Sequence, residues 1–247
     1  MLIRGLVSTL ILWAAMPVLS ETAPVLEVVT TQYPPFEFVE NGTLHGQDVA
    51  TVRTVLEHMG FVPRFRVLPW ARAELMVRNG DADLLFSLTA SPQRERYYLF
   101  TNPISTARDV FYARKSANVS WSSFNDLAGL RLGVSASYSY APDFMAWLDR
   151  DLAEVMTIRQ EQPDLAGLRM VALDRVDLFI CEETACNYLL RKYRGQFPEL
   201  NRVAAIPGTV GETRYFRAAF SRQRPDAEQL RSAFNRTLDQ LDLGPSD

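Results

Sequence analysis

Residues 83–94 read DLLFSLTASPQR and predict a strand that runs into a polar loop. The strand is expected over Asp83–Leu88, and Ser91-Pro92 is typical of a helix start, because proline suits the first helical position. Such a helix start would offer free N–H groups to an anion near Arg94. Because ligands in open α/β sheets lie beyond the carboxyl ends of strands, this loop is expected to border a binding site.

On both sides of this stretch, predicted strands alternate with predicted helices. Asp48 can cap a helix that ends at Gly60. Asn41-Gly42 between Phe36–Val39 and Leu44 is typical of a hairpin turn. Further strands are expected at Val25–Thr30, Phe61–Val67, Leu130–Val134, Val176–Ile180 and Arg214–Ser221, and helices at Trp70–Asn79, Asp143–Leu152, Leu165–Leu173, Glu183–Tyr193 and Pro225–Leu241. Repeated β-α-β units predict an α/β fold with helices on both faces of mostly parallel sheets.

The first twenty residues differ from the rest of the chain. Residues 6–19 are almost wholly apolar, and Arg4 is the only charged residue before Glu21. This pattern predicts a secretory signal peptide over residues 1–20, and hence a periplasmic protein. A membrane anchor is the alternative, but the apolar run is shorter than the roughly 20 residues that a spanning helix needs.

The charge and the cysteine content of the chain limit the classes of binding partner and cofactor that we expect. Without residues 1–20, 25 basic residues face 29 acidic residues, a balance of −4 that does not favour nucleic acid as a partner. Export would permit a disulfide between Cys181 and Cys186, but on a regular helix these positions diverge, so two buried unbonded side chains are slightly favoured. No cofactor or metal is expected, because these cysteines and the distant His45 and His58 do not form a zinc ligand set.

Short motifs follow one another along nearly the whole chain. They are Tyr33-Pro34-Pro35-Phe36, Gly46-x-Asp48, Pro69-Trp70, NGDAD at 79–83, SLTASPQR at 87–94, FTNP at 100–103, LAGLRLGV at 127–134, SYSY at 137–140 and LDRVD at 173–177 before Glu182. In this order and spacing they resemble the bacterial extracellular solute-binding proteins of the polar amino-acid type, family 3, which are substrate-binding components of ABC transporters.

The resemblance implies a two-lobed periplasmic-binding-protein fold of type II. It would have two mixed sheets flanked by helices and hinged by two crossover strands. Lobe 1 would comprise residues 21–103 and 212–247, and the hinge and lobe 2 would comprise residues 104–211, with hinges near Ile104–Asp109 and Gly208–Thr213. The lobes would close over a ligand by hinge motion. The protein is expected to be a monomer that meets the membrane permease of an ABC transporter.

Arg94 is the first candidate for ligand binding. The resembling family places an arginine after a Ser/Thr-Pro-x step on the ligand's α-carboxylate, which a guanidinium can grip with two parallel hydrogen bonds. A surface arginine in the charged run 94–96 is the alternative. Ser87, Leu88 and Thr89 would complete the carboxylate shell or take the ligand amine. The stretch from Asp83 to Arg94 is one residue shorter than the family's usual spacing. This difference leaves the roles of Ser87 and Thr89 in ligand binding open.

Glu182 is the candidate in the other half of the chain. It stands where the family places an acid, usually Asp, against the ligand's ammonium group. The alternative is an acid that favours a helix N-terminus together with Glu183. A loop of lobe 2 with Ser137, Tyr138 and Ser139 would contact the carboxylate.

Tyr33 and Trp70 are the predicted aromatic walls of the site. A flat ring can stack on a ligand side chain or cover a cation. Core packing is the alternative for both residues. The sequence differs from the family's usual pattern at Gln47, Ser137 and Glu182, which leaves the identity of the ligand open.

The predicted function is capture of a small zwitterion, such as an amino acid, for delivery to an ABC transporter. No catalytic residue is expected, because the sequence offers no assembled Ser/His/Asp constellation. One alternative is a periplasmic enzyme of the cyclohexadienyl dehydratase type, with a general acid at Glu182. A sensor or an inactive relative is a third possibility.

Overall fold

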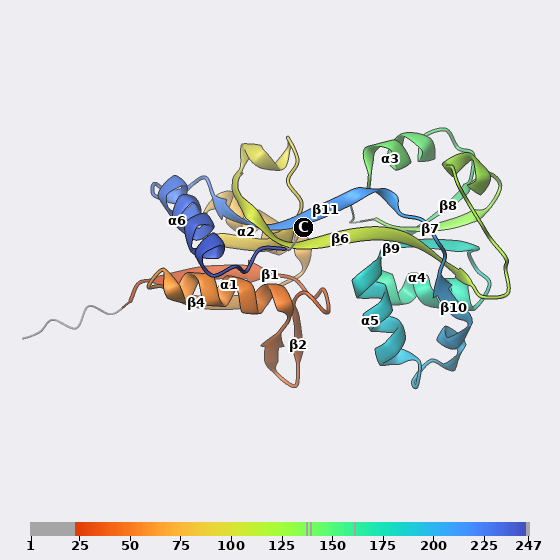
Figure 1. Ribbon diagram of the computed structural model, residues 1–247, viewed down its shortest axis with the longest axis horizontal. Coiled ribbons are helices and arrows are strands. Elements are labelled where there is room, and N and C mark those ends of the chain that lie inside the picture. The colour runs from red at the N-terminus through yellow and green to blue at the C-terminus, as the bar shows by residue number, and fades with distance from the viewer. Residues whose placement is uncertain (1–22, 137, 139, 161, 246–247) are drawn as a thin grey trace, which may run out of the picture.

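The computed structural model describes residues 23–136, 138, 140–160 and 162–245 (Figure 1). The predicted signal peptide at residues 1–20 lies outside the described residues. Two predicted site residues, Ser137 and Ser139, also lie outside them. Within the described ranges, no helix is long and apolar enough to cross a membrane.

A mixed β-sheet forms the centre of the described chain. Its strands are β1 (Val25–Thr30), β4 (Val62–Val67), β5 (Leu84–Leu88), β6 (Tyr98–Arg114), β7 (Arg131–Ser135), β8 (Glu154–Ile158), β9 (Leu178–Glu182), β10 (Val203–Ala205) and β11 (Val210–Ser221). They pair in the order β4-β1-β5-β11-β6-β9-β7-β8, and β10 joins β6. The trio β4-β1-β5 and the trio β9-β7-β8 are parallel, whereas β6 and β11 are antiparallel to their neighbours.

Helices cover both faces of this sheet, and a small hairpin stands apart from it (Figure 1). The helices are α1 (Gln47–His58), α2 (Trp70–Asn79), α3 (Pro142–Leu148), α4 (Pro163–Ala172), α5 (Glu183–Tyr193) and α6 (Ala227–Gln240). The hairpin consists of β2 (Phe38–Glu40) and β3 (Thr43–His45), which pair around Asn41-Gly42 as predicted.

Lobe 1 is built around the trio β4-β1-β5. Successive residues of β1 point to opposite faces, as the period of a strand requires. Val28 packs with Val52 of α1 and Phe234 of α6. Val29 packs on the other face with Val77 of α2. Apolar side chains on both faces of the sheet thus bury it between two helical layers.

Lobe 2 repeats this arrangement around the trio β9-β7-β8. Tyr112 of β6 packs with Leu168 of α4 on one face. Its neighbour Phe111 packs with Phe144 of α3 on the other face. Each lobe therefore has its own core on either side of the shared sheet.

Strands β6 and β11 cross from one lobe to the other (Figure 1). Ile104 of β6 packs in lobe 1, whereas Val110 packs in lobe 2. On β11, Val210 packs in lobe 2 and Phe220 in lobe 1. The two-lobed α/β fold with two crossover strands is confirmed, and these strands join the two predicted sheets into one hydrogen-bonded path. The exact lobe boundaries and the hinge motion stay predictions.

Two local predictions in lobe 1 are wrong. Asp48 does not cap α1, because Gly46 occupies the N-cap position and the Asp48 carboxylate accepts hydrogen bonds from Ser87 and Ser105 instead. Ser91-Pro92 does not start an α-helix. A 3₁₀ turn over Arg94–Arg96 follows, and β6 begins two residues later, so an anion site at a helix N-terminus is excluded there.

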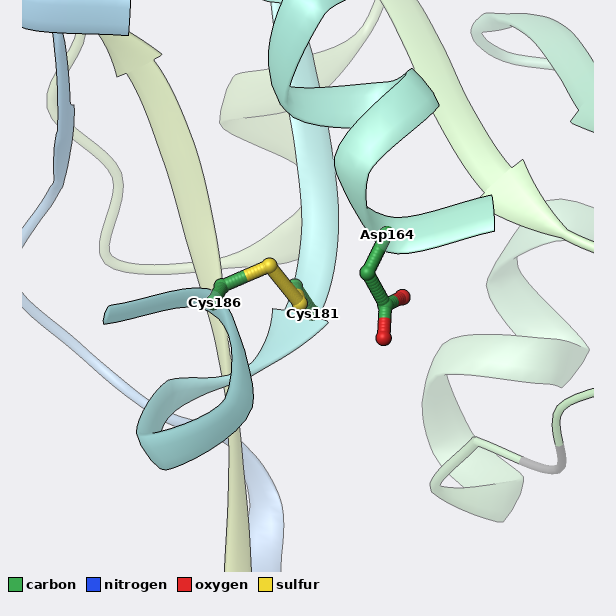
Figure 2. Close-up of side chains that lie close together, drawn as sticks. All are labelled: Asp164, Cys181 and Cys186. Carbon is green, nitrogen blue, oxygen red and sulfur yellow. A yellow bond between two sulfur atoms is a disulfide. The ribbon is translucent and has the colours of Figure 1, made fainter. Parts of the chain in front are cut away.

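Cys181 and Cys186 form a disulfide, contrary to the favoured expectation (Figure 2). The expectation assumed a regular helix across both positions. Cys181 instead lies in β9, the chain bends at Glu182, and Cys186 lies in α5. The bend brings the Cα atoms to 6.2 Å, which a disulfide can span.

Candidate functional site

A cavity of about 750 Å³ lies between the lobes. Lobe 1 lines it with Tyr33, Trp70 and Arg94, and lobe 2 lines it with Tyr138 and Asp164. Ligand cavities for small molecules fall in the range of about 300–1,000 Å³. The cavity therefore has the size and the position of a ligand site between two lobes.

The loop that carries Tyr33 is fixed on the N-terminus of α1. The N–H groups of Gln47 and Asp48 donate to the carbonyl oxygens of Pro35 and Phe36 at 3.3 and 3.1 Å. Gly46 has a φ of 134°, and a Cβ atom there would collide with the Phe36 carbonyl. The Pro-Pro loop and the Gly46-x-Asp48 motif thus form one unit, which positions Tyr33 at the cavity.

Arg94 lies on the cavity wall and is oriented by lobe 1. Its Nε donates to the carboxylate of Glu74 on α2 at 3.0 Å. Nη1 donates to the carbonyl and hydroxyl oxygens of Thr89 at 3.1 and 3.3 Å. The guanidinium carbon lies 5.5 Å from the centre of the Trp70 ring. Nη2 donates to none of the described residues, so this edge of the guanidinium is available to an anionic ligand.

Ser87, Leu88 and Thr89 border the cavity as their place at the end of β5 predicts. The oxygens of Thr89 are occupied by Arg94. Leu88 is buried, and the Ser87 hydroxyl lies between two carboxyl groups beneath the cavity. Contact between these three residues and a ligand stays a prediction, but Ser87 and Thr89 both have a structural role.

Ser87 links the carboxyl groups of Glu37 and Asp48. Its Oγ lies 2.5 Å from Glu37 and 2.7 Å from Asp48. A hydroxyl has one proton, so it can donate to one of these groups and must accept from the other. Burial, and then the charge of Asp48, raise the pKa of Glu37 well above its usual range. The raised pKa favours the protonated form of Glu37, which can donate to Ser87 while Ser87 donates to Asp48.

Tyr33 and Tyr138 bring aromatic rings from opposite lobes together. Their ring centres are 5.9 Å apart in an edge-to-face arrangement. Tyr33 also stacks on Phe36 at 5.5 Å. Edge-to-face and offset contacts are the favoured geometries of aromatic pairs. Tyr33, Trp70 and Tyr138 all line the cavity.

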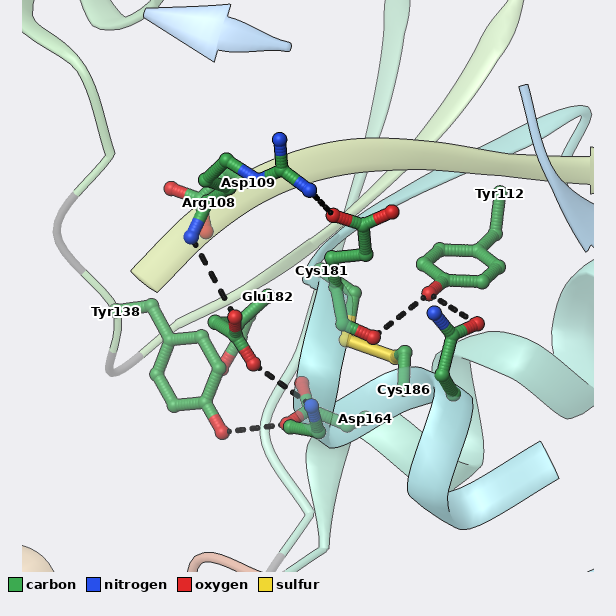
Figure 3. Close-up of a disulfide and its surroundings, with 12 residues drawn as sticks. Arg108, Asp109, Tyr112, Tyr138, Asp164, Cys181, Glu182 and Cys186 are labelled. Carbon is green, nitrogen blue, oxygen red and sulfur yellow. Dashed lines mark hydrogen bonds and ion pairs between the residues drawn. A yellow bond between two sulfur atoms is a disulfide. The ribbon is translucent and has the colours of Figure 1, made fainter. Parts of the chain in front are cut away.

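Glu182 lies behind the cavity wall, and it is not one of the described residues that line it. It is the N-cap of α5 and accepts a hydrogen bond from the N–H of Ala185 at 2.7 Å (Figure 3). Its other oxygen accepts from the N–H of Arg108 at 3.4 Å. This geometry fits the helix-start alternative, and contact of Glu182 with a ligand stays a prediction.

Asp164 is a cavity residue that the sequence reasoning missed. It is the second residue of α4, and its Oδ2 accepts from the Tyr138 hydroxyl at 2.9 Å (Figure 3). Burial raises the pKa of Asp164 to about 7, and the charges of Glu182 and Asp109 add to this effect. The missing signal was β8, because a residue that follows the carboxyl end of a parallel strand is a site candidate.

A second interlobe contact lies at the rim of the cavity. Lys192 of α5 donates to Glu40 of the β2–β3 hairpin at 2.7 Å. The rings of Phe38 and Tyr188 approach to 5.7 Å in the same region. Lys192, Phe38 and Tyr188 line the cavity, so the hairpin of lobe 1 reaches α5 of lobe 2 across its edge.

These features define a two-lobed solute-binding protein, and comparison with known proteins agrees. The sequence profile described as "Bacterial extracellular solute-binding proteins, family 3" matches residues 26–243. The chain belongs to this family, as its motifs indicated. Members of the family are extracellular or periplasmic proteins that bind solutes, and its relatives include binding components of amino-acid ABC transporters.

Three similar proteins are named as binding proteins. The "Probable amino-acid ABC transporter-binding protein" of Haemophilus influenzae is 32% identical over 46% of this chain and 45% of its own length. The "Probable amino-acid-binding protein YxeM" of Bacillus subtilis is 25% identical over 86% of this chain and 76% of its own length. The "L-cystine-binding protein TcyJ" of Escherichia coli is 22% identical over 65% of this chain and 59% of its own length.

Solved structures share the fold. A histidine kinase sensor domain with similarity to periplasmic binding proteins has a TM-score of 0.71 at 22% identity, over 88% of this chain and 90% of its own. An ancestral arginine-binding protein has a TM-score of 0.70 at 20% identity, over 90% of this chain and 94% of its own. The ancestral amino acid-binding protein AncCDT-1, a precursor of cyclohexadienyl dehydratase, has a TM-score of 0.68 at 20% identity, over 88% and 89%. At these identities the likeness shows the fold.

Proposed function

We propose that this chain is a periplasmic binding protein, exported by residues 1–20, that captures an amino acid or a related small zwitterion between its lobes. It would deliver this solute, as a monomer, to the membrane permease of an ABC transporter. Lobe 1 would comprise residues 21–103 and 212–247, and the crossover strands would act as the hinge.

The cavity between the lobes carries this proposal. Lobe 1 presents the guanidinium of Arg94, which Glu74 orients, and lobe 2 presents the carboxyl group of Asp164. Tyr33 and Trp70 add aromatic surface to the same cavity. Groups of opposite charge from the two lobes in one cavity suit a ligand that carries both a carboxylate and an ammonium group. The names of the amino-acid-binding relatives support the same class of ligand.

The test is a thermal-shift screen of the mature protein against the protein amino acids and L-cystine, followed by calorimetry on each one that binds. Binding to the folded state raises the melting temperature with ligand concentration. Arg94→Ala should weaken binding by on the order of 100-fold, because it removes a charged partner from a desolvated site.

Arg78→Ala is the matched control. Arg78 is also an arginine of lobe 1 that covers an aromatic ring, Tyr97, but it lies outside the cavity. It should leave the affinity unchanged. A screen without any thermal shift, or an Arg94→Ala protein that binds like the wild type, would contradict the proposal.

The dehydratase alternative is not favoured, because the three relatives described above are named as binding proteins. We expect the wild-type protein to return a cyclohexadienyl acid unchanged after incubation. Appearance of an aromatic product in the ultraviolet spectrum would instead establish an enzyme on this fold.

A further inference from the structure

Asp164 is a buried acid with one unsatisfied oxygen at the ligand cavity. The residue is 5% exposed and lines the cavity at the start of α4. Its Oδ2 accepts from Tyr138, whereas its buried Oδ1 has no hydrogen-bond partner among the residues that the structure describes. Buried polar atoms are nearly always paired, so a carboxylate oxygen without a partner among the described residues can accept a hydrogen bond from a ligand in the cavity.

The surroundings of Asp164 are acidic and apolar. Glu182 and Asp109 lie near enough to raise its pKa, and the carboxyl oxygen and the disulfide sulfurs of Cys181 and Cys186 lie within 4.8 Å of one another (Figure 2). Bonded sulfurs are not thiolates, so this group is not a metal ligand set while the disulfide is intact. The cation Arg214 forms an ion pair with Asp109 at 2.6 Å.

Titratable and charged groups face Asp164 from each element packed against it. They are Tyr33 before the β2–β3 hairpin, Asp109 and Tyr112 on β6, Tyr138 and Tyr140 after β7, and Glu182 on β9. Arg214 on β11 lines the same cavity and pairs with Asp109. The tyrosines are neutral near pH 7, because burial raises their pKa values further. Acids thus outnumber basic groups in this described neighbourhood, and an added cation would be stabilised there.

Glu182 is less suited to receive that cation. Both of its oxygens accept backbone N–H groups, from Ala185 and from Arg108, and it does not line the cavity. Asp164 has the free oxygen and lies beside the rings of Tyr33 and Tyr138, which can face a cation.

We propose that Asp164, rather than Glu182, accepts the ammonium group of the bound amino acid and is the residue of lobe 2 that selects amines. This assignment rests on the proposed function and names the anionic group of the same site. It also makes affinity depend on pH, because the ionised carboxylate is the form that pairs with an ammonium group. With a pKa of about 7 in the free protein, the affinity should increase as the pH rises through 7.

The experiment compares Asp164→Asn with Asp143→Asn in the mature protein. Asp143 is a matched control, since it also follows a proline at the start of a helix of lobe 2, but it is exposed and lies outside the cavity. The probes are the protein amino acids and L-cystine, each beside its N-acetyl derivative, which keeps the carboxylate and lacks the ammonium group. Calorimetry is run at about pH 5.5 and about pH 8.5.

Wild-type protein should bind the amino acid roughly 30-fold more tightly at the higher pH, as a group that titrates near 7 requires. Asp164→Asn should lose at least about tenfold in affinity at the higher pH and lose the pH dependence. Asp143→Asn should behave as wild type, and no N-acetyl derivative should bind well to any of the three proteins.

If Asp164→Asn fails to fold, Tyr138→Phe provides a second test. The hydrogen bond from Tyr138 lowers the pKa of Asp164, so its loss should move the midpoint of the affinity profile to higher pH. An Asp164→Asn protein with wild-type affinity and pH profile, or an unmoved midpoint in Tyr138→Phe, would overturn the assignment while leaving the proposed function intact. If no probe binds wild-type protein, both fail.

Discussion

Asp48 and Glu37 are buried acids of lobe 1, each 1% exposed, and share the hydroxyl of Ser87. Burial raises the pKa of Asp48 to about 6, against the hydrogen bonds from Ser87 and Ser105 that favour its ionised form. The network therefore contains a carboxyl group that is neutral in mild acid and charged near neutral pH, directly beneath the ligand cavity. Ionisation of such a group opposes folding.

The raised pKa of Asp48 determines how the stability of the protein changes with pH. A raised pKa in the folded state gives stability that is present below about pH 4 and is lost as the pH rises through about 6. Two pKa units correspond to about 3 kcal/mol in the free energy of unfolding. Asp48→Asn should thus show a smaller fall in that free energy between about pH 4 and about pH 7 than the wild type shows.

Urea unfolding of both proteins at the two pH values measures this difference. Asp164 also has a raised pKa and also lowers the free energy of unfolding as the pH rises. The difference between Asp48→Asn and the wild type therefore measures the contribution of Asp48 alone. Asp81→Asn, at an exposed position of the same lobe, should retain the full wild-type fall. An equal fall in Asp48→Asn and wild type would contradict the prediction.

At the residue scale, the sequence motifs identified residues that line the cavity, and their contact with a ligand stays a prediction. Arg94 and Trp70 stand in short runs, and their cavity positions follow from β5 and α2, which were placed well. Asp164 was missed because it follows strand β8, which the sequence did not predict, and because its neighbours Tyr138 and Glu182 are distant in the sequence. Glu182 lies behind the cavity wall because backbone N–H groups bind its oxygens, and its contact with a ligand stays a prediction.

At the scale of elements, strong local signals set the boundaries. Strand β1, helix α2 and helix α5 begin and end where the sequence placed them. Strand β8 was not predicted, because four of its five residues are exposed on the sheet edge and no apolar alternation marks it.

Gly46 joins two elements, the Pro-Pro loop and helix α1, and its substitution is a sharp test of this junction. Gly46→Ala should lower the free energy of unfolding by about 3–5 kcal/mol, the sum of backbone strain and a collision with the Phe36 carbonyl. Gly42→Ala is the control, because Gly42 also has a positive φ, 76°, but has open space around it.

Gly42→Ala should lower the free energy of unfolding by only about 1 kcal/mol. Urea unfolding measures both variants, and thermal-shift binding measures whether Tyr33 stays in place. A Gly46→Ala protein as stable as Gly42→Ala would show that the loop can move away from α1, against the contacts described above.

At the scale of the whole molecule, the lobes meet at two kinds of contact. Tyr33 and Tyr138 meet beside the cavity, and Lys192 meets Glu40 at its rim. The crossover strands carry a register shift between Val210 and Arg214, where their pairing is irregular. Irregular pairing of this kind bends a strand locally. Irregular strand pairing between the lobes, together with an exposed ion pair at the rim, supports the prediction that the lobes open and close.

We therefore expect the ion pair between Lys192 and Glu40 to favour a closed form of the protein over an open form. Lys192→Glu places two acids face to face and should separate the hairpin from α5, which increases the radius of gyration of the ligand-free protein in small-angle X-ray scattering. Adding Glu40→Lys restores opposite charges and should return the radius toward the wild-type value. Lys115→Glu changes the other lysine of the chain, which is exposed and outside the cavity, and should have no effect.

Because an exposed ion pair is weak and screened by salt, the effect of Lys192→Glu should diminish at high ionic strength. A radius that is the same in all four proteins would show that the rim contact does not hold the lobes together.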